Sequence, residues 1–177
     1  MSSALEALLK ELYEKPKNIN ASTLRTVAHT VDFVATLSQH PQGLTAASPS
    51  TPNILVVDDE VISRRAVVSA LEKADLKCVS LADPQQALKT LEETSFDLII
   101  LDVEMPGMSG FDLCSKLRNL PKHVQTPVVF VTGLNDFESR ARSTLSGGSD
   151  LIAKPFLLME LAVKALTLVM KGQLNIH

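Results

Sequence analysis

Apolar residues follow two different patterns along the chain. Up to residue 38 they recur every three or four positions, as on one face of an α-helix. After residue 53 they form short consecutive runs, separated by amphipathic stretches. We therefore expect an N-terminal helical hairpin over residues 1–38 and an α/β domain over residues 53–177. Residues 39–52, between them, have three prolines with Ser, Thr and Gly and no periodicity, which is typical of a linker.

Each helix of the predicted hairpin has one apolar stripe. The stripes comprise Leu5, Leu8, Leu9 and Leu12 on the first helix, and Leu24, Val27, Ala28, Val31, Val34 and Ala35 on the second. Helices this short are marginal alone, so both stripes are expected to be buried. Two such hairpins can form a four-helix bundle, which predicts a homodimer through residues 1–38. The alternative is that the helices fold back on their own α/β domain.

From residue 53 onward, apolar runs and amphipathic stretches alternate. The predicted strands lie near 54–57, 77–81, 97–101, 127–132 and 151–153, and the predicted helices near 61–74, 84–93, 110–119, 136–146 and 156–171. This alternation indicates a parallel sheet with helices on both faces. The central strands are apolar throughout, as expected when both faces of a sheet are covered.

Polar side chains follow four of these runs directly. Asp58 and Asp59 follow the first run, Asp102 the third, Thr132 the fourth and Lys154 the last. In a parallel α/β sheet these strand ends lie on one edge, where ligands bind. Singly, each residue is more simply a helix cap or a surface residue. Together, carboxylates, a hydroxyl and an ammonium suit the binding of Mg²⁺ and a phosphoryl group, and an Asp at such a position can form an acyl phosphate.

Residues 53–172 resemble a response-regulator receiver domain. The motifs that carry the resemblance are Ile-Leu-Val-Val-Asp-Asp-Glu at 54–60, Asp-Leu-Ile-Ile-Leu-Asp-Val-Glu-Met-Pro-Gly-Met-Ser-Gly at 97–110, Pro-Val-Val-Phe-Val-Thr-Gly at 127–133 and Lys-Pro-Phe at 154–156. The resemblance implies a flavodoxin-like, doubly wound fold with five strands in the order 2-1-3-4-5 and five helices. It also implies that a sensor histidine kinase or a histidine phosphotransfer protein phosphorylates Asp102.

The same resemblance implies roles for the neighbouring residues. Asp58, Asp59, Asp102 and the backbone carbonyl of Glu104 would bind Mg²⁺. Lys154 would pair with phosphoryl oxygens, Thr132 would donate a hydrogen bond to them, and Gly133 would leave space for the phosphoryl group. Pro155 matches the proline that follows the lysine in the family, often through a cis bond.

Position 151 departs from the family pattern. Most receivers have Tyr or Phe three residues before the lysine, an aromatic ring that turns inward on activation, whereas this chain has Leu151. We therefore expect signalling to depend on the loop 133–137 and on repacking of the helix 136–146. Thr132, Gly133, Leu151 and Pro155 form the expected switch region.

His29 lies on the second predicted helix, away from the apolar stripe. Histidine phosphotransfer domains carry an exposed helical histidine, but they place Lys and Gly shortly after it, where this chain has Asp32 and Phe33. Because Asp32 would repel a phosphohistidine, a solvated surface histidine is the favoured interpretation.

Composition limits the partners and the compartment. The net charge of −3 gives no basic footprint for nucleic acid. No apolar run approaches the ~18 residues of a membrane span, and the first residues do not resemble a signal peptide. Cys78 and Cys114 have no metal-like spacing and are expected to be reduced, packed thiols in a cytoplasmic protein.

Few residues follow the last predicted helix, so the signal is expected to leave through contacts with an unknown output protein or through the hairpin. Two other functions remain open. A haloacid dehalogenase-type phosphatase also uses an Asp nucleophile with Mg²⁺, but it places that Asp on its first strand. The other is a phosphorylation-independent scaffold, which has no need of the clustered charge.

Overall fold

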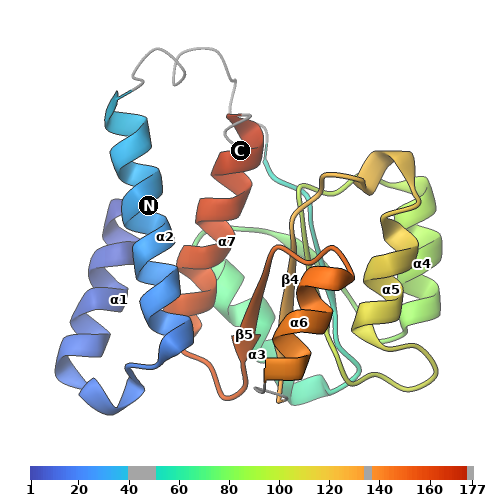
Figure 1. The fold of residues 1–177 in the computed structure, drawn as a ribbon, viewed down its shortest axis with the longest axis horizontal. Coiled ribbons are helices and arrows are strands. Elements are labelled where there is room, and N and C mark those ends of the chain that lie inside the picture. The colour runs from blue at the N-terminus through green and yellow to red at the C-terminus, as the bar shows by residue number, and fades with distance from the viewer. Residues whose placement is uncertain (40–50, 134–136, 175–177) are drawn as a thin grey trace.

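A five-stranded parallel sheet forms the centre of the molecule (Figure 1). The computed structural model describes residues 1–39, 51–133 and 137–174. The strands stand in the order β2-β1-β3-β4-β5, and every neighbouring pair is parallel. They are β1 (Ile54–Val57), β2 (Cys78–Leu81), β3 (Leu98–Asp102), β4 (Val128–Thr132) and β5 (Asp150–Ala153). The predicted fold class and strand order are confirmed.

Five helices cover the two faces of this sheet. They are α3 (Val61–Glu72), α4 (Pro84–Glu93), α5 (Gly110–Leu117), α6 (Phe137–Leu145) and α7 (Leu158–Gln173), with a short 3-10 helix η3 (Pro121–His123) before β4. Alternate strand residues point to opposite faces. Leu55 and Ile99 therefore pack with α4 and α5, whereas Ile54 and Ile100 pack with α3 and α7. The predicted element boundaries differ from these by no more than two residues.

The N-terminal extension folds back on the α/β domain. It comprises α1 (Ser2–Glu14), a 3-10 helix η1 (Pro16–Asn18) and α2 (Ala21–Gln39), and both α-helices lie against α7 (Figure 1). Leu8 and Leu12 of α1 are buried and pack on Val163 of α7. The fold-back arrangement, left as an alternative by the sequence, is thus the one observed within a single chain. Most of the predicted linker lies outside the described residues.

Within a single chain the second apolar stripe is buried only in part. Val27 packs against the cluster of Leu8, Leu12 and Val163, whereas Leu24, Val31 and Val34 are 57%, 49% and 41% exposed. The buried side of α2 is mostly hydroxylic and comprises Ser22, Thr23, Thr26, Thr30 and Phe33. Most of the apolar side of this helix therefore faces solvent within a single chain, and its hydroxylic side, with Phe33, faces the protein.

Hydrogen bonds explain why hydroxyl groups can fill this contact. Ser22 Oγ donates to Oε1 of the buried Glu160 at 2.5 Å, and the hydroxyl oxygens of Thr30 and Thr167 lie 3.1 Å apart. Thr26 Oγ1 donates to the Ser22 carbonyl at 3.1 Å. A buried polar group is costly only when it lacks a partner. We call this contact between α2 and α7 the hydroxyl seam.

Candidate functional site

Three carboxylates meet at the carboxyl edge of the sheet. Asp58 and Asp59 follow β1, and Asp102 is the last residue of β3. One carboxylate oxygen from each lies within 4.8 Å of the others. Asp58 and Asp102 are buried, at 2% and 5% exposure, and Asp59 is the most accessible of the three. The strand-end pattern thus predicted which acidic residues come together.

Lys154 joins two of these carboxylates. Its Nζ lies 2.9 Å from Asp102 Oδ1 and 3.1 Å from Asp58 Oδ2. Partial burial works against the charged ammonium, but the hydrogen bond to Asp102 and the charges of Asp102 and Asp58 outweigh it, so the pKa of Lys154 is raised. Lys154 therefore remains a cation at this edge.

One ammonium does not balance the cluster. Burial raises the pKa of Asp102, helped by the charge of Asp58 and opposed by Lys154 and a hydrogen bond from the Val103 backbone. Three carboxylates beside one lysine leave an excess of negative charge in a partly buried place. Carboxylate oxygens are the ligands that Mg²⁺ prefers, so this donor set fits the ion. Asp58, Asp59 and Asp102 are the side chains that would hold it.

Two residues of α3 hold the first acidic pair in position. Ser63 Oγ donates to Asp58 Oδ2 at 2.5 Å, and Arg64 Nη1 donates to the Asp58 carbonyl at 2.6 Å. The backbone amide of Glu60 donates to Asp58 Oδ1 at 2.9 Å. The sequence analysis did not identify Ser63 and Arg64. Their position in the first turn of the predicted helix, directly beyond Asp58, was the available signal.

Gly110 is a third residue near the site whose role was not identified from the sequence. A Cβ atom at this position would lie 2.1 Å from the backbone oxygen of Asp102, and the Gly110 amide donates to the Val103 carbonyl at 3.0 Å. The loop after β3 therefore returns so closely to Asp102 that only glycine fits.

The other predicted residues lie around this cluster. Thr132 is buried at the end of β4, and its carbonyl accepts from the Lys154 amide at 2.7 Å. Pro155 is exposed, and the Lys154–Pro155 bond is cis. A Cβ on Gly133 would make an ordinary 3.5 Å contact with Glu104 Oε2, so packing alone does not require glycine there.

Leu151 lies on β5, away from the acidic cluster. It is buried beside Phe130 in the apolar cluster under α4 and α5. We expected the loop 133–137 and the helix 136–146 to carry the signal, since position 151 has no aromatic ring. Residues 134–136 of this region lie outside the described residues.

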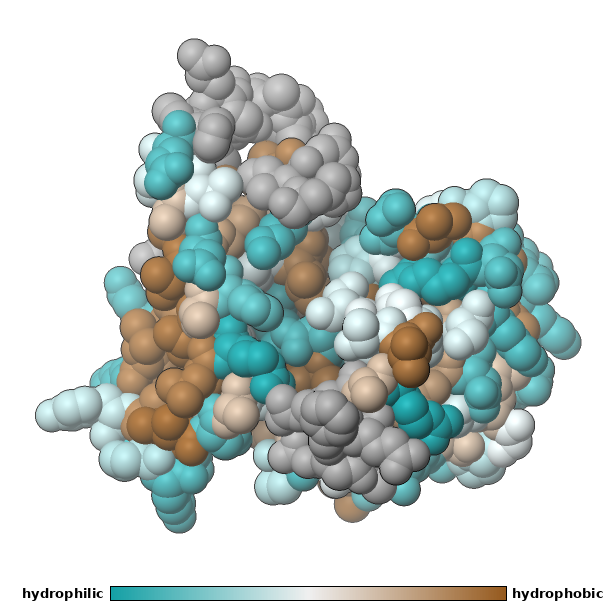
Figure 2. Space-filling view, viewed as in Figure 1, coloured by the Kyte–Doolittle hydropathy of each residue, from teal (hydrophilic) through white to brown (hydrophobic). Residues whose placement is uncertain are grey.

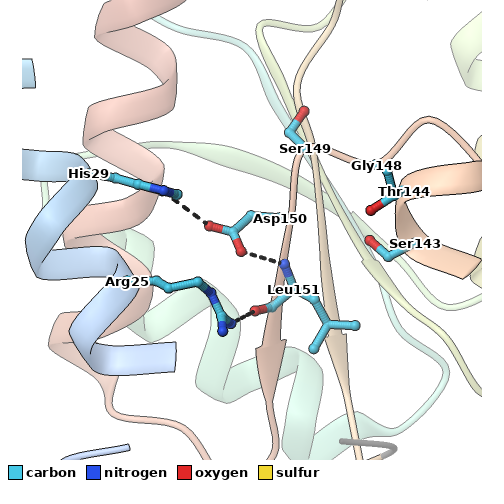
Figure 3. A pocket seen from close by; sticks show the side chains of 8 residues that line it. All are labelled: Arg25, His29, Ser143, Thr144, Gly148, Ser149, Asp150 and Leu151. Carbon is cyan, nitrogen blue, oxygen red and sulfur yellow. Dashed lines mark hydrogen bonds and ion pairs between the residues drawn. The ribbon is translucent and has the colours of Figure 1, made fainter. Parts of the chain in front are cut away.

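A shallow pocket separates α2 from β5 and α6 (Figure 3). Figure 3 shows Arg25 and His29 of α2 pointing toward β5. His29 Nδ1 lies 3.9 Å from Asp150 Oδ2, and Arg25 Nη2 lies 3.5 Å from the Leu151 carbonyl oxygen. Asp150 also pairs with the buried Lys164 of α7. His29 is exposed, as the sequence predicted, and it lies beside an acidic group.

The sheet order defines a doubly wound α/β domain of the flavodoxin-like class, and three carboxylates cluster at the carboxyl edge of its sheet. The family model of the response regulator receiver domain matches residues 54–166. The chain belongs to this family, that of the receivers of two-component systems.

Relatives and solved structures agree with this assignment. Protein RcaC of Microchaete diplosiphon is 35% identical over 119 residues, which cover 67% of this chain and 18% of RcaC. The cyclic di-GMP phosphodiesterase response regulator RpfG of Xanthomonas campestris pv. campestris is 32% identical over 123 residues, 68% of this chain and 32% of RpfG. Chemotaxis protein CheY4 of Vibrio cholerae matches with a TM-score of 0.62 and 30% identity, over 66% of this chain and 97% of CheY4.

The chain spans no more than about a third of the length of these two curated relatives. In the part of the chain that the structure describes, no helix has both the length and the hydropathy that a membrane crossing requires.

Proposed function

We propose that this chain accepts a phosphoryl group on Asp102 from the phosphohistidine of a sensor histidine kinase or of a phosphotransfer protein. The observation that carries the proposal is the position of Lys154 Nζ, within 3.1 Å of both Asp102 and Asp58, beside three clustered carboxylates. Receiver family membership supports the same function. The compartment we propose is the cytoplasm, where such kinases present their phosphohistidine.

In the transfer step, an Asp102 carboxylate oxygen attacks phosphorus. The new P–O bond forms as the P–N bond to the donor histidine breaks, and the leaving nitrogen keeps the electron pair of that bond. Lys154 pairs with a phosphoryl oxygen, and the Thr132 hydroxyl donates a hydrogen bond to another. Bound Mg²⁺ supplies positive charge that opposes the repulsion between the carboxylates and the phosphoryl oxygens. Asp58, Asp59 and the Glu104 backbone carbonyl are its other proposed ligands.

We propose that the chain is a phosphoacceptor and has no turnover activity of its own. A dehalogenase-type phosphatase carries its nucleophile on the first strand, whereas Asp102 ends β3. A scaffold that does not use phosphate has no need to gather three carboxylates and a lysine at one edge, because such charges repel one another and are costly to bury.

The signal has a short physical route from this site to the hairpin. β5 is four residues long. Lys154 follows its carboxyl end, whereas Asp150 and Leu151, near its other end, contact His29 and Arg25 of α2. A phosphoryl group that draws Lys154 away from Asp102 would therefore act on the strand that α2 touches. We include in the proposal an output protein that reads this surface, and a homodimer through residues 1–38.

Mass spectrometry after treatment with acetyl phosphate tests the phosphoacceptor role. The wild-type chain should gain one phosphoryl group in the presence of Mg²⁺ and little in its absence. Asp102→Asn should gain none, and the exposed control Asp32→Asn should behave as wild type. The proposal would be contradicted if Asp102→Asn were labelled as much as the wild type, or if labelling did not depend on Mg²⁺.

The route through β5 has a separate test. Beryllofluoride with Mg²⁺ should shift amide signals in the loop 133–137, in α6 and around Arg25 and His29. If Asp102 is occupied and the α2 signals do not move, the hairpin is not part of the output.

A further inference from the structure

The outer side of α2 is apolar and regular. Leu24 and Val31 are 57% and 49% exposed, and Ala28 and Ala35 are exposed between and beyond them. These positions are separated by three or four residues, so they lie on one face of the helix. We call these four residues the α2 outer face. In Figure 2, hydrophobic side chains gather on the visible surface over α1 and α2.

The inner contacts fix this orientation. Turning the apolar side inward would remove the hydrogen bonds of Ser22 to Glu160 and of Thr30 to Thr167. It would leave Glu160, which is 1% exposed, without the hydrogen bond from Ser22. A buried polar group without a partner costs about 1–3 kcal/mol. The α2 outer face is therefore held toward solvent and available to a partner.

We propose that the α2 outer face is where two copies of this chain meet, with α2 of one copy antiparallel to α2 of the other. The sizes of the side chains favour this antiparallel arrangement. Larger and smaller residues alternate along the face as Leu24, Ala28, Val31 and Ala35. A two-fold axis between positions 29 and 30 places Leu24 opposite Ala35 of the second copy, and Val31 opposite Ala28. Each larger side chain then meets a small one, which allows the two helices to approach closely.

Charge complementarity selects the same arrangement. Arg25 and Asp32 flank one edge of the α2 outer face, about two helical turns apart, and are opposite in charge. In the antiparallel pair, Arg25 of each copy lies within about 3 Å along the helix axis of Asp32 of the other. In a parallel pair this edge of each helix would instead lie against the opposite edge of the other, which carries Val27 and Val34, so Arg25 and Asp32 would not meet. Charges at the rim of a contact add little affinity but fix its orientation.

Arg25 has hydrogen-bond donors left for this pairing beyond its contact with β5. Its contact with the Leu151 carbonyl is long, at 3.5 Å, and a guanidinium has several further donors. The acidic cluster lies at the carboxyl edge of the sheet, so dimer formation through α2 does not require phosphate on Asp102. This inference specifies the surface of the proposed homodimer and is independent of the phosphoacceptor proposal.

Sedimentation of the full chain, from micromolar to near-millimolar concentration, tests the interface. The wild type and Asp102→Asn should both show a monomer–dimer equilibrium. Leu24→Lys with Val31→Lys should raise the dimer dissociation constant about tenfold or more, equivalent to at least about 1.4 kcal/mol. The control is Leu145→Lys on α6, because Leu145 is 86% exposed and lies outside the proposed face. It should leave the equilibrium unchanged.

A charge exchange tests the antiparallel geometry. Arg25→Glu alone should weaken the dimer several-fold, and Arg25→Glu with Asp32→Arg should restore it. The proposal is overturned if the wild type stays monomeric, or if the double lysine variant has the dimer dissociation constant of the wild type. A dimer that the charge exchange fails to restore overturns the antiparallel arrangement. Because the lysine substitutions are at exposed positions, circular dichroism should show the wild-type fold in every variant.

Discussion

The ammonium of Lys154 lies 2.9 Å from Oδ1 of Asp102, across a sequence separation of 52 residues. The two residues come from the ends of β3 and β5, with β4 between them. The parallel sheet brings both ends to one edge, so the contact follows from topology and not from local sequence.

Lys154→Met should destabilise the chain when no divalent cation is present. The variant leaves Asp58 and Asp102 facing each other without the shared ammonium. Removing one partner of a buried pair costs about 3–5 kcal/mol, and we expect about 2 kcal/mol here because the Lys154 side chain is 21% exposed. Urea unfolding measures the loss. MgCl₂ should reduce it, and Lys89→Met, at an exposed position on α4, should show none. A loss of the same size with and without Mg²⁺ would contradict this account of the cluster.

Mg²⁺ should stabilise the folded chain through the three carboxylates. A ligand that binds only the folded state at ten times its dissociation constant adds about 1.4 kcal/mol. Asp59→Asn should remove most of the resulting rise in melting temperature, whereas Glu93→Gln, an acidic residue outside the cluster, should keep it. Differential scanning calorimetry across a MgCl₂ titration is the measurement. An undiminished rise in Asp59→Asn would exclude that residue as a ligand.

Glu160 should make stability depend on pH. Burial raises the pKa of Glu160, and the hydrogen bond from Ser22 and the charge of Lys164 only partly oppose this, while Asp150 adds to it. The folded chain therefore holds this proton more tightly than the unfolded chain. The stabilisation is complete below the ordinary pKa and is lost as pH rises through the raised one.

Glu160→Gln removes the titrating group but keeps an oxygen that can accept from Ser22. The free energy of unfolding of this variant, relative to wild type, should therefore increase across a pH series that starts below the ordinary glutamate pKa and runs to mildly alkaline pH. Chemical denaturation across that range provides the comparison, with Glu6→Gln on the exposed side of α1 as the control. Parallel pH profiles for wild type and Glu160→Gln would show that Glu160 does not titrate in this window.

Gly110→Ala should be among the most damaging single changes near the site. Its Cβ would be placed 2.1 Å from the Asp102 backbone oxygen, so the loop or the strand end has to move. We expect a loss of about 3 kcal/mol, at the upper end for overpacking. Gly172→Ala on α7 is the matched control, since nothing lies within 4 Å of the added atom. Similar unfolding free energies for the two variants would mean that the loop after β3 is more pliable than the structure indicates.

The sequence predicted the sheet well because the three central strands are apolar throughout and four of the five runs are followed directly by a recognisable polar residue. It also predicted which polar residues meet, because parallel strands place their ends together. It did not predict which side of α2 is buried. Thr30 Oγ1 donates to the Thr26 carbonyl within the same helix at 2.7 Å, so a hydroxylic face is partly satisfied before any packing occurs. The other partner of this hydroxylic face is Glu160, which accepts a hydrogen bond from Ser22. The two residues are 138 positions apart, so no local sequence pattern reveals the contact.

Ser63 and Gly110 were missed for a similar reason. Each acts through one close approach to an aspartate, Ser63 Oγ to Asp58 and the Gly110 backbone to Asp102. A serine in a helix and a glycine at a helix start have many ordinary explanations in a sequence. Only the path of the backbone distinguishes the residue that supports the acidic cluster from one that does not.

The hydroxyl seam has a consequence for detachment of the helix. Its two sides carry hydroxyl and charged groups that water can hydrate, so lifting α2 from α7 would uncover a largely polar flank along the seam, with Phe33 as the apolar exception. Loss of α1 as well would be different, because it would uncover Val163, on which Leu8 and Leu12 pack. Detachment of α2 alone therefore exposes less apolar surface than detachment of the whole hairpin.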